Sequence, residues 1–362
     1  MGAEIVSQSS VVAQRPQRRM RVQSYSGALR YDWSRGQAHW LLEGTRMKIV
    51  VLANKWWECE AMLTAMVNTN AFPPALSDGS ISSPWFDSLS SPRSQANDAN
   101  NATSRAVFSY TQKNTVLFTV EVWCVSDLLE KTDPSTSSSS AKAAHLKEKL
   151  FKPGTVLPDL VIAVGTAGTA TELPNRTGGV AVGGQVFLHN AHLPNTQDAN
   201  PKSTWSDPLQ ETLITPSIDK LFFEQIAAFD SASALLHFLP LKRNPSSSPV
   251  ITTGREDVAL GTLNVTDYNE YKFKDPETVA SYLAHRHHAI PVSLETTHGL
   301  IRLACDPAPF IFVTGITDSF LHFDEQVGVP ALADSQNFAA AYNTGITVRY
   351  MLAGYMKKML NL

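Results

Sequence analysis

The sequence predicts a layered α/β domain with helices on both faces of a single sheet. Short runs of aliphatic and β-branched residues, which are typical of buried strands, recur along the chain. Segments of helical composition lie between these runs, and no internal repeat is present. Strands that alternate with helices favour helical layers on either side of a sheet over an all-helical or all-β fold.

The domain is predicted to span residues 47–362. Residues 1–46 are polar and Arg-rich, so we interpret them as an N-terminal extension. Two Ser-rich insertions are expected at about 71–106 and 133–144, where apolar residues show little periodicity. The rest of the chain is long enough for one domain with a sizeable core.

The first strand is expected over 47–53 and is followed at once by a helix over 56–67. A later strand begins at residue 160 and is expected to end in a Gly-rich turn over 165–168. Other strands are expected at 107–110, 115–128, 179–190, about 257–265 and about 309–316. Other helices are expected at about 141–151, 216–239, 276–287, 294–305 and 334–360.

Composition excludes two classes of protein. The longest apolar run is far shorter than the roughly 18 residues of a membrane span, so no membrane protein is expected. Thirty basic and 33 acidic residues give a net charge of −3, which argues against a general nucleic-acid binder. Charged residues make up only 17 %, so a carboxylate inside an apolar segment calls for an explanation.

The three cysteines, Cys59, Cys124 and Cys305, are too few and too scattered for a disulfide framework or a four-ligand zinc site. Their apolar surroundings indicate buried free thiols. The N-terminus shows no continuous apolar segment of the kind found in secretory signals, and we expect a cytoplasmic protein.

Polar residues stand at four places where strands end or helices begin, and open α/β sheets bind ligands beyond the carboxyl ends of their strands. They are Glu58, Thr166 with Gly168, Glu295 and Asp318. Each has a structural alternative: Glu58 complements a helix dipole, the glycines form a tight turn, and Glu295 and Asp318 cap helices.

Two of these carboxylates suit specific chemistry. Glu295 lies among Leu294, Leu300 and Ile301, and a shielded carboxylate there can accept hydrogen bonds from sugar hydroxyls. Partial burial raises a carboxyl pKa, so Asp318 is a candidate general acid. The histidines over 285–288 point to different helix faces and lack a partner at i+4, so we expect no metal and no cofactor.

Together these places resemble the purine nucleoside phosphorylase and 5′-methylthioadenosine nucleosidase superfamily over about residues 47–360. MKIVVLANKWWECEAML is similar to its opening strand and Glu-rich turn, and PDLVIAVGTAG to its PD-x-V-I-N-T-G-S-A-G. VSLETTHGLIRLAC is similar to its E-M-E helix, and APFIFVTGITD to its P-F-x-x-V-R-x-I-S-D. The resemblance implies a three-layer αβα sandwich around a mixed twisted sheet.

The resemblance also implies roles for individual residues. Glu58 activates the attacking water, Thr166 and Gly168 help to hold it, and Glu295 binds the ribose hydroxyls. Asp318 protonates the leaving base. Such a site stabilises the positive charge on the ribosyl ring and the negative charge on the base that develop as the N-glycosidic bond breaks.

Departures from the family pattern bear on the nucleophile and on the base. Ala163 stands where the phosphorylases have an Arg before the Gly-rich segment, and a phosphate dianion without a guanidinium is poorly held. We therefore expect hydrolysis. A phosphorylase with a relocated phosphate site and a non-catalytic nucleoside sensor are the alternatives.

The base pocket is expected to differ from that of the usual methylthioadenosine enzymes. Asn264 and Val265 stand where the family has its base-stacking aromatic, and Leu294 replaces the Met of E-M-E. Ser293 and Thr314 also depart from the pattern, replacing its first Glu and its Arg. The partner implied is a small-molecule nucleoside, with neither nucleic acid nor membrane, and the resemblance implies a homo-oligomer.

Overall fold

The structure is a computed structural model, and the residues that it describes all belong to one compact unit, Arg46–Leu362. The described ranges are 47–67, 104–112, 115–129, 139–151, 154–169, 177–190, 208–212, 238–240, 250–260, 292–295, 297–319 and 330–359. The predicted extension, the predicted helix at 276–287 and nearly all of that at 216–239 lie outside these ranges. So do Asn264, Val265 and the histidines over 285–288.

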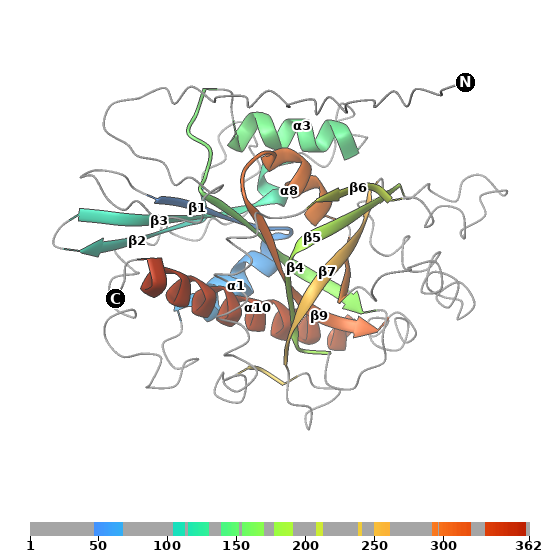
Figure 1. The fold of residues 1–362 in the computed structure, drawn as a ribbon. Coiled ribbons are helices and arrows are strands. Elements are labelled where there is room, and N and C mark those ends of the chain that lie inside the picture. The colour runs from blue at the N-terminus through green and yellow to red at the C-terminus, as the bar shows by residue number, and fades with distance from the viewer. Residues whose placement is uncertain are drawn as a thin grey trace, which may run out of the picture. The chain divides into compact units, whose positions relative to one another are not determined.

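The described strands form one mixed nine-stranded sheet (Figure 1). They are β1 (Met47–Ala53), β2 (Ala106–Gln112), β3 (Thr115–Cys124), β4 (Leu160–Thr169), β5 (Val180–Asn190), β6 (Pro208–Thr212), β7 (Ile251–Leu260), β8 (Ser293–Glu295) and β9 (Phe310–Ser319). Their order is β2-β3-β1-β4-β8-β7-β5-β6, and β9 pairs with both β4 and β5. β1 is parallel to β3 and β4, whereas β9 is parallel to β4 and antiparallel to β5.

Helices cover both faces of this sheet. α1 (Trp56–Val67) and α10 (Pro330–Met359) pack against each other on one face. α3 (Ser139–Leu150) and α8 (His298–Cys305) pack together on the other face (Figure 1). A short helix, α2 (Val125–Leu128), follows β3 directly. The predicted three-layer αβα arrangement is therefore confirmed.

The core lies in the central strands. Ile49 to Ala53 of β1 and residues 160–164 of β4 are buried without alternation, as are residues 310–313 of β9. A strand covered by helices on both faces needs apolar side chains in both directions, which explains these unbroken apolar runs. Cys59, Cys124 and Cys305 are buried free thiols, as the sequence predicted.

Several predicted boundaries were wrong because long-range pairing overrides local composition. The segment over 165–168 is no turn: β4 continues to Thr169, and the whole segment pairs with β9. The helix predicted from 294 begins only at His298, because residues 293–295 form β8 against β7.

Corrections also apply near the predicted insertions. The strand predicted over 115–128 ends at Cys124, where α2 begins. Arg105 and Ala106, at the end of the first predicted insertion, are buried. Residues 139–144 of the second belong to α3, and Ala143 packs into the core.

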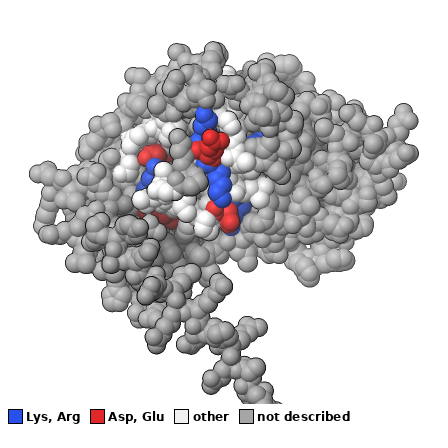
Figure 2. All heavy atoms as spheres, turned by 90° about the horizontal axis from the view of Figure 1, so that it is seen from above, with Lys and Arg blue, Asp and Glu red and all other residues white. Residues whose placement is uncertain are grey.

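The described surface on the α3 side carries basic and acidic side chains side by side (Figure 2). Arg302 pairs with Asp306 at 3.2 Å between Nη1 and Oδ1. No helix among the described residues has a stretch both long and apolar enough to cross a membrane.

Candidate active site at the end of β4

Glu58 lies in the first turn of α1 and reaches back to β4. Its side chain is buried, although the residue follows the exposed Trp56 closely. One carboxylate oxygen accepts the backbone N–H of Lys55 at 2.8 Å, as expected for a helix start. The other accepts the hydroxyl of Thr166 at 2.6 Å and the backbone N–H of Thr166 at 3.0 Å. Glu58 therefore stabilises the start of α1, as the helix-dipole interpretation holds. It also connects α1 to Thr166 of β4.

Glu295 ends β8 immediately before α8 and is also buried. One oxygen accepts the side-chain amide N–H of Asn54 at 2.8 Å. The other accepts the backbone N–H groups of Thr297 and His298, so the carboxylate satisfies the start of α8, as the capping interpretation anticipated. Burial raises the pKa of Glu295, and the charge of His298 works in the opposite direction.

Asp318 is the second-to-last residue of β9 and is buried. Its Oδ1 accepts the hydroxyl of Thr317, whereas its Oδ2 has no partner among the described residues. Burial raises the pKa of Asp318 to about 6, against the opposing effect of the Thr317 hydrogen bond. Within the described range Asp318 is a strand residue.

The register of β4 brings these residues together. Gly168 pairs with Leu294 of β8 and with Asp318 of β9. Because a strand has two hydrogen-bonding edges, β8 and β9 flank β4 at this level. Thr166, which holds Glu58, lies two residues earlier on β4. The sequence-predicted residues Glu58, Thr166, Gly168, Leu294, Glu295 and Asp318 therefore converge on the carboxyl end of β4.

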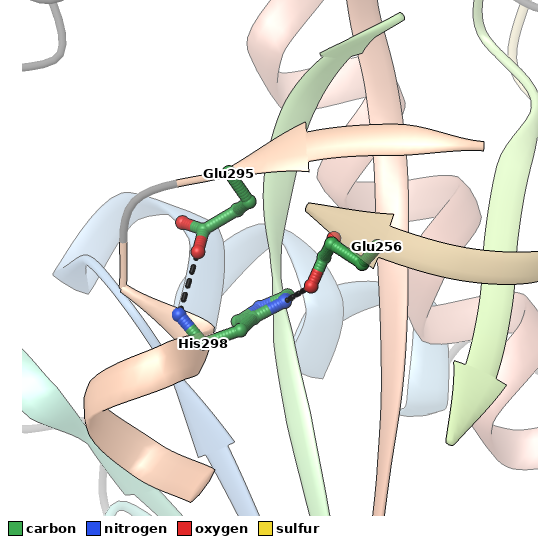
Figure 3. Close-up of side chains that lie close together, drawn as sticks. All are labelled: Glu256, Glu295 and His298. Atoms are coloured by element: carbon green, nitrogen blue, oxygen red, sulfur yellow. Dashed lines mark hydrogen bonds and ion pairs between the residues drawn. The ribbon is translucent and has the colours of Figure 1, made fainter. Parts of the chain in front are cut away.

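Sequence analysis missed two buried charged residues, Glu256 of β7 and His298 of α8 (Figure 3). Glu256 Oε2 lies 2.6 Å from His298 Nδ1. Glu256 Oε1 accepts the hydroxyls of Ser293 at 2.8 Å and of Thr314 at 3.0 Å. Ser293 and Thr314 are two of the positions where the chain departs from the family pattern, and these two departures were the available signal.

His298 is charged in this environment. Burial alone would lower its pKa, but the carboxylates of Glu256 and Glu295, and more weakly that of Glu58, outweigh this effect and raise the pKa to about 9. Its Nε2 has no partner among the described residues. The ring lies against β4 at Gly165, where an added Cβ would come within 2.2 Å of Asn54 Nδ2 and 3.1 Å of His298 Nε2. Only glycine permits this close approach.

Glu256, Glu295 and His298 lie close enough to one another to be tested as metal ligands. Each of the four carboxylate oxygens already accepts at least one hydrogen bond from a protein donor. Zinc, with ligand distances of about 2.0–2.2 Å, would hold its nitrogen and oxygen ligands farther apart than the 2.6 Å between His298 and Glu256. The arrangement fits an internal network of charges better than a metal site.

No protein-family model matches the sequence, and no curated protein does. Among solved structures, the chain is similar to a 5′-methylthioadenosine/S-adenosylhomocysteine nucleosidase from Colwellia psychrerythraea in complex with adenine. That similarity has a TM-score of 0.44 and 13 % identity, and covers 86 % of this chain and 97 % of that chain.

Two further solved structures are similar. S-adenosylhomocysteine nucleosidase from Streptococcus pyogenes has a TM-score of 0.46 and 12 % identity, over 86 % of this chain and 98 % of that chain. Futalosine hydrolase of Helicobacter pylori has a TM-score of 0.45 and 12 % identity, over 84 % of this chain and 97 % of that chain. These proteins are members of the nucleoside phosphorylase superfamily.

Proposed function

We propose that this chain is an N-ribosyl hydrolase that cleaves the glycosidic bond of a purine nucleoside or a related nucleoside. The observation that carries the proposal is the convergence at β4: Gly168 is paired with Leu294, next to Glu295, and with Asp318, while Glu58 is bonded to Thr166. Burying three carboxylates from different elements at one strand end costs stability. We therefore interpret them as retained for chemistry.

Asp318 is the group best suited to protonate the leaving base. One of its carboxylate oxygens has no partner within the part of the chain that the structure describes, and with a pKa of about 6 an appreciable fraction of the side chain carries a proton near neutral pH. Breaking the bond between ribose and base leaves negative charge on the base, and proton donation from Asp318 neutralises it as the bond breaks.

Glu58 is the group best suited to activate water. Its two oxygens are held by Lys55 and Thr166, so the carboxylate has a fixed direction. A fixed carboxylate accepts a proton from the water that attacks the ribosyl carbon. Glu295 is assigned to the ribose hydroxyls, because an ionised carboxylate accepts hydrogen bonds from them.

Water is favoured over phosphate as the nucleophile. Ala163 is fully buried and offers only a methyl group where the phosphorylases have an Arg. The buried arginines in the described ranges have other partners: Arg105 binds Asp127, and Arg349 donates to the Met66 carbonyl. Within the described ranges, a phosphate dianion would therefore lack a buried bidentate partner of the kind it prefers.

The test is free-base release from a panel of purine nucleosides, with and without phosphate. We expect release that is independent of phosphate, and Asp318→Asn should reduce it by roughly 100-fold or more while nucleoside binding persists. Asp306→Asn, which changes an exposed aspartate at the end of α8, is the matched control and should leave release unchanged.

Other outcomes would replace the proposal. Release that requires phosphate would identify a phosphorylase. Nucleoside binding in a thermal-shift assay without any release would identify a sensor, and Asp318→Asn would then alter affinity only.

A further inference from the structure

The centre of the site contains a chain of contacts that runs from β9 to Glu295. Ser293 and Thr314 donate their hydroxyls to Glu256. Glu256 holds the His298 ring at Nδ1, and the backbone N–H of His298 donates to Glu295 (Figure 3). Every member is buried, so water contributes little to orienting these groups. Glu256 therefore fixes the ring of His298, the residue whose backbone N–H contacts Glu295.

The network brings the imidazole of His298 together with several carboxylates. The acidic groups that act on His298 are Glu256 from β7, Glu295 from β8 and Glu58 from α1. A buried carboxylate without a counter-charge is costly and tends to take up a proton instead. The charge of His298 opposes the burial that raises the pKa of Glu295, whereas the nearby charge of Glu256 adds to that rise.

We propose that Glu256 and His298 form a positioning dyad for Glu295, in which a charged imidazole keeps the sugar-binding carboxylate ionised and oriented. Glu256 fixes the ring and its charge, and His298 passes both effects on to Glu295 through its charge and its backbone N–H. This inference rests on the proposed function for the identity of what Glu295 binds, which is a sugar hydroxyl pair.

Ionisation matters because it sets what Glu295 can accept. An ionised carboxylate has only acceptor sites, whereas a protonated one places a donor on one oxygen. Sugar hydroxyls that donate to Glu295 would lose one acceptor if Glu295 took the proton of His298. Such a transfer would leave two neutral groups, and the carboxylate of Glu256, 2.6 Å from His298 Nδ1, favours retention of the proton on the ring.

A titration of the His298 ring by NMR tests the dyad without any assumption about activity. In the wild-type protein we expect His298 to stay protonated through about pH 8, and in Glu256→Gln we expect its pKa to fall by about one unit or more. The signal is assigned by its loss in His298→Gln. A wild-type His298 that titrates near its ordinary value, or a pKa that Glu256→Gln leaves unchanged, would overturn the proposal.

Steady-state kinetics of base release provide the second measurement. Glu256→Gln should raise KM about tenfold, as expected for a weakened contact to a charged group, and change kcat by less than about threefold. Glu148→Gln, which changes an exposed residue of α3, is the matched control. A merely structural role for Glu256 would lower the amount of folded enzyme and leave KM unchanged, which would contradict the dyad.

The two proposals fail separately. If the wild-type protein releases no base from any nucleoside, the proposed function fails, and the NMR titration still decides the dyad. If Glu256→Gln does not fold, Thr314→Val removes one of the two hydroxyl donors to Glu256 and should raise KM by about threefold. An unchanged KM in Thr314→Val would then count against the dyad.

Discussion

Asp127 and Asp318 are both buried aspartates, but their carboxylates have different hydrogen-bond partners. Asp127 of α2 binds Arg105 through both oxygens, at 2.6 Å to Nε and 2.7 Å to Nη2. Asp318 of β9 accepts the Thr317 hydroxyl on one oxygen and has no partner among the described residues on the other. Their exposed fractions, 7 % and 4 %, are nearly the same.

The comparison shows that burial alone does not distinguish a structural charge from a functional one. The Arg105–Asp127 pair is a bidentate contact, and it joins the residue before β2 to α2. Asp318, at the end of β4, has one oxygen without a partner among the described residues and a raised pKa, which suit the proton donation proposed above. The same side chain therefore contributes to stability in one place and costs stability in the other.

The largest expected effect comes from breaking the complete pair. Asp127→Asn removes the bidentate carboxylate from the buried Arg105, whose contact with the exposed Glu60 is longer, at 3.9 Å between Nη1 and Oε1, and should lower the free energy of unfolding by about 3–5 kcal/mol in urea titrations. Glu121→Gln, which breaks the partly exposed pair with Lys48, is the control and should cost less than about 1 kcal/mol. Equal losses in the two variants would show that the Arg105–Asp127 pair adds nothing beyond an ordinary surface contact.

Asp318→Asn should act in the opposite direction on stability. The folded pKa of about 6 lies above the ordinary aspartate pKa of 3.8, so the native state holds the proton more tightly than the unfolded chain. Ionisation therefore costs stability as pH rises through about 6, and Asn avoids that cost. We expect a gain of about 1–3 kcal/mol at about pH 7.5 that disappears near pH 4. A loss of stability at about pH 7.5 would contradict this account.

The pH dependence of kcat/KM should follow the same group. The proposed mechanism requires the acid form of Asp318, so kcat/KM should fall by about tenfold per pH unit above the Asp318 pKa of about 6. The basic limb should be absent from the residual activity of Asp318→Asn. The Asp127→Asn variant should retain the basic limb of the pH profile, once activity is expressed per folded molecule.

The smallest expected effect concerns the anchor of Glu58. Thr166→Val removes the hydroxyl donor but leaves the backbone N–H of Thr166 on the same oxygen, so kcat/KM should fall by a factor that corresponds to about 1 kcal/mol. Thr166→Ser keeps the hydroxyl and should retain wild-type activity. If Ser and Val behave alike, the hydroxyl has no part in positioning Glu58.

Local composition was sufficient to predict the core strands and to place some residues of the candidate site. β1, β4 and β9 contain short unbroken apolar runs rich in β-branched or aromatic residues, and such runs favour a buried strand. Glu58 could be placed near the end of β1 because it lies in the first turn of the helix that follows this strand. The Gly-rich end of β4 could not be recognised as a strand, since its conformation depends on pairing with β9 and β8.

By itself, the amino-acid sequence determined the αβα layering, the buried thiols and the positions of Glu58, Glu295 and Asp318 at element ends, because these follow from periodicity and from neighbours along the chain. Only the tertiary structure decided which charges meet. Glu256 and His298 are 42 residues apart, and Glu58 and Thr166 are 108 apart. Contacts across such distances depend on strand order and register, which residues close in sequence do not specify.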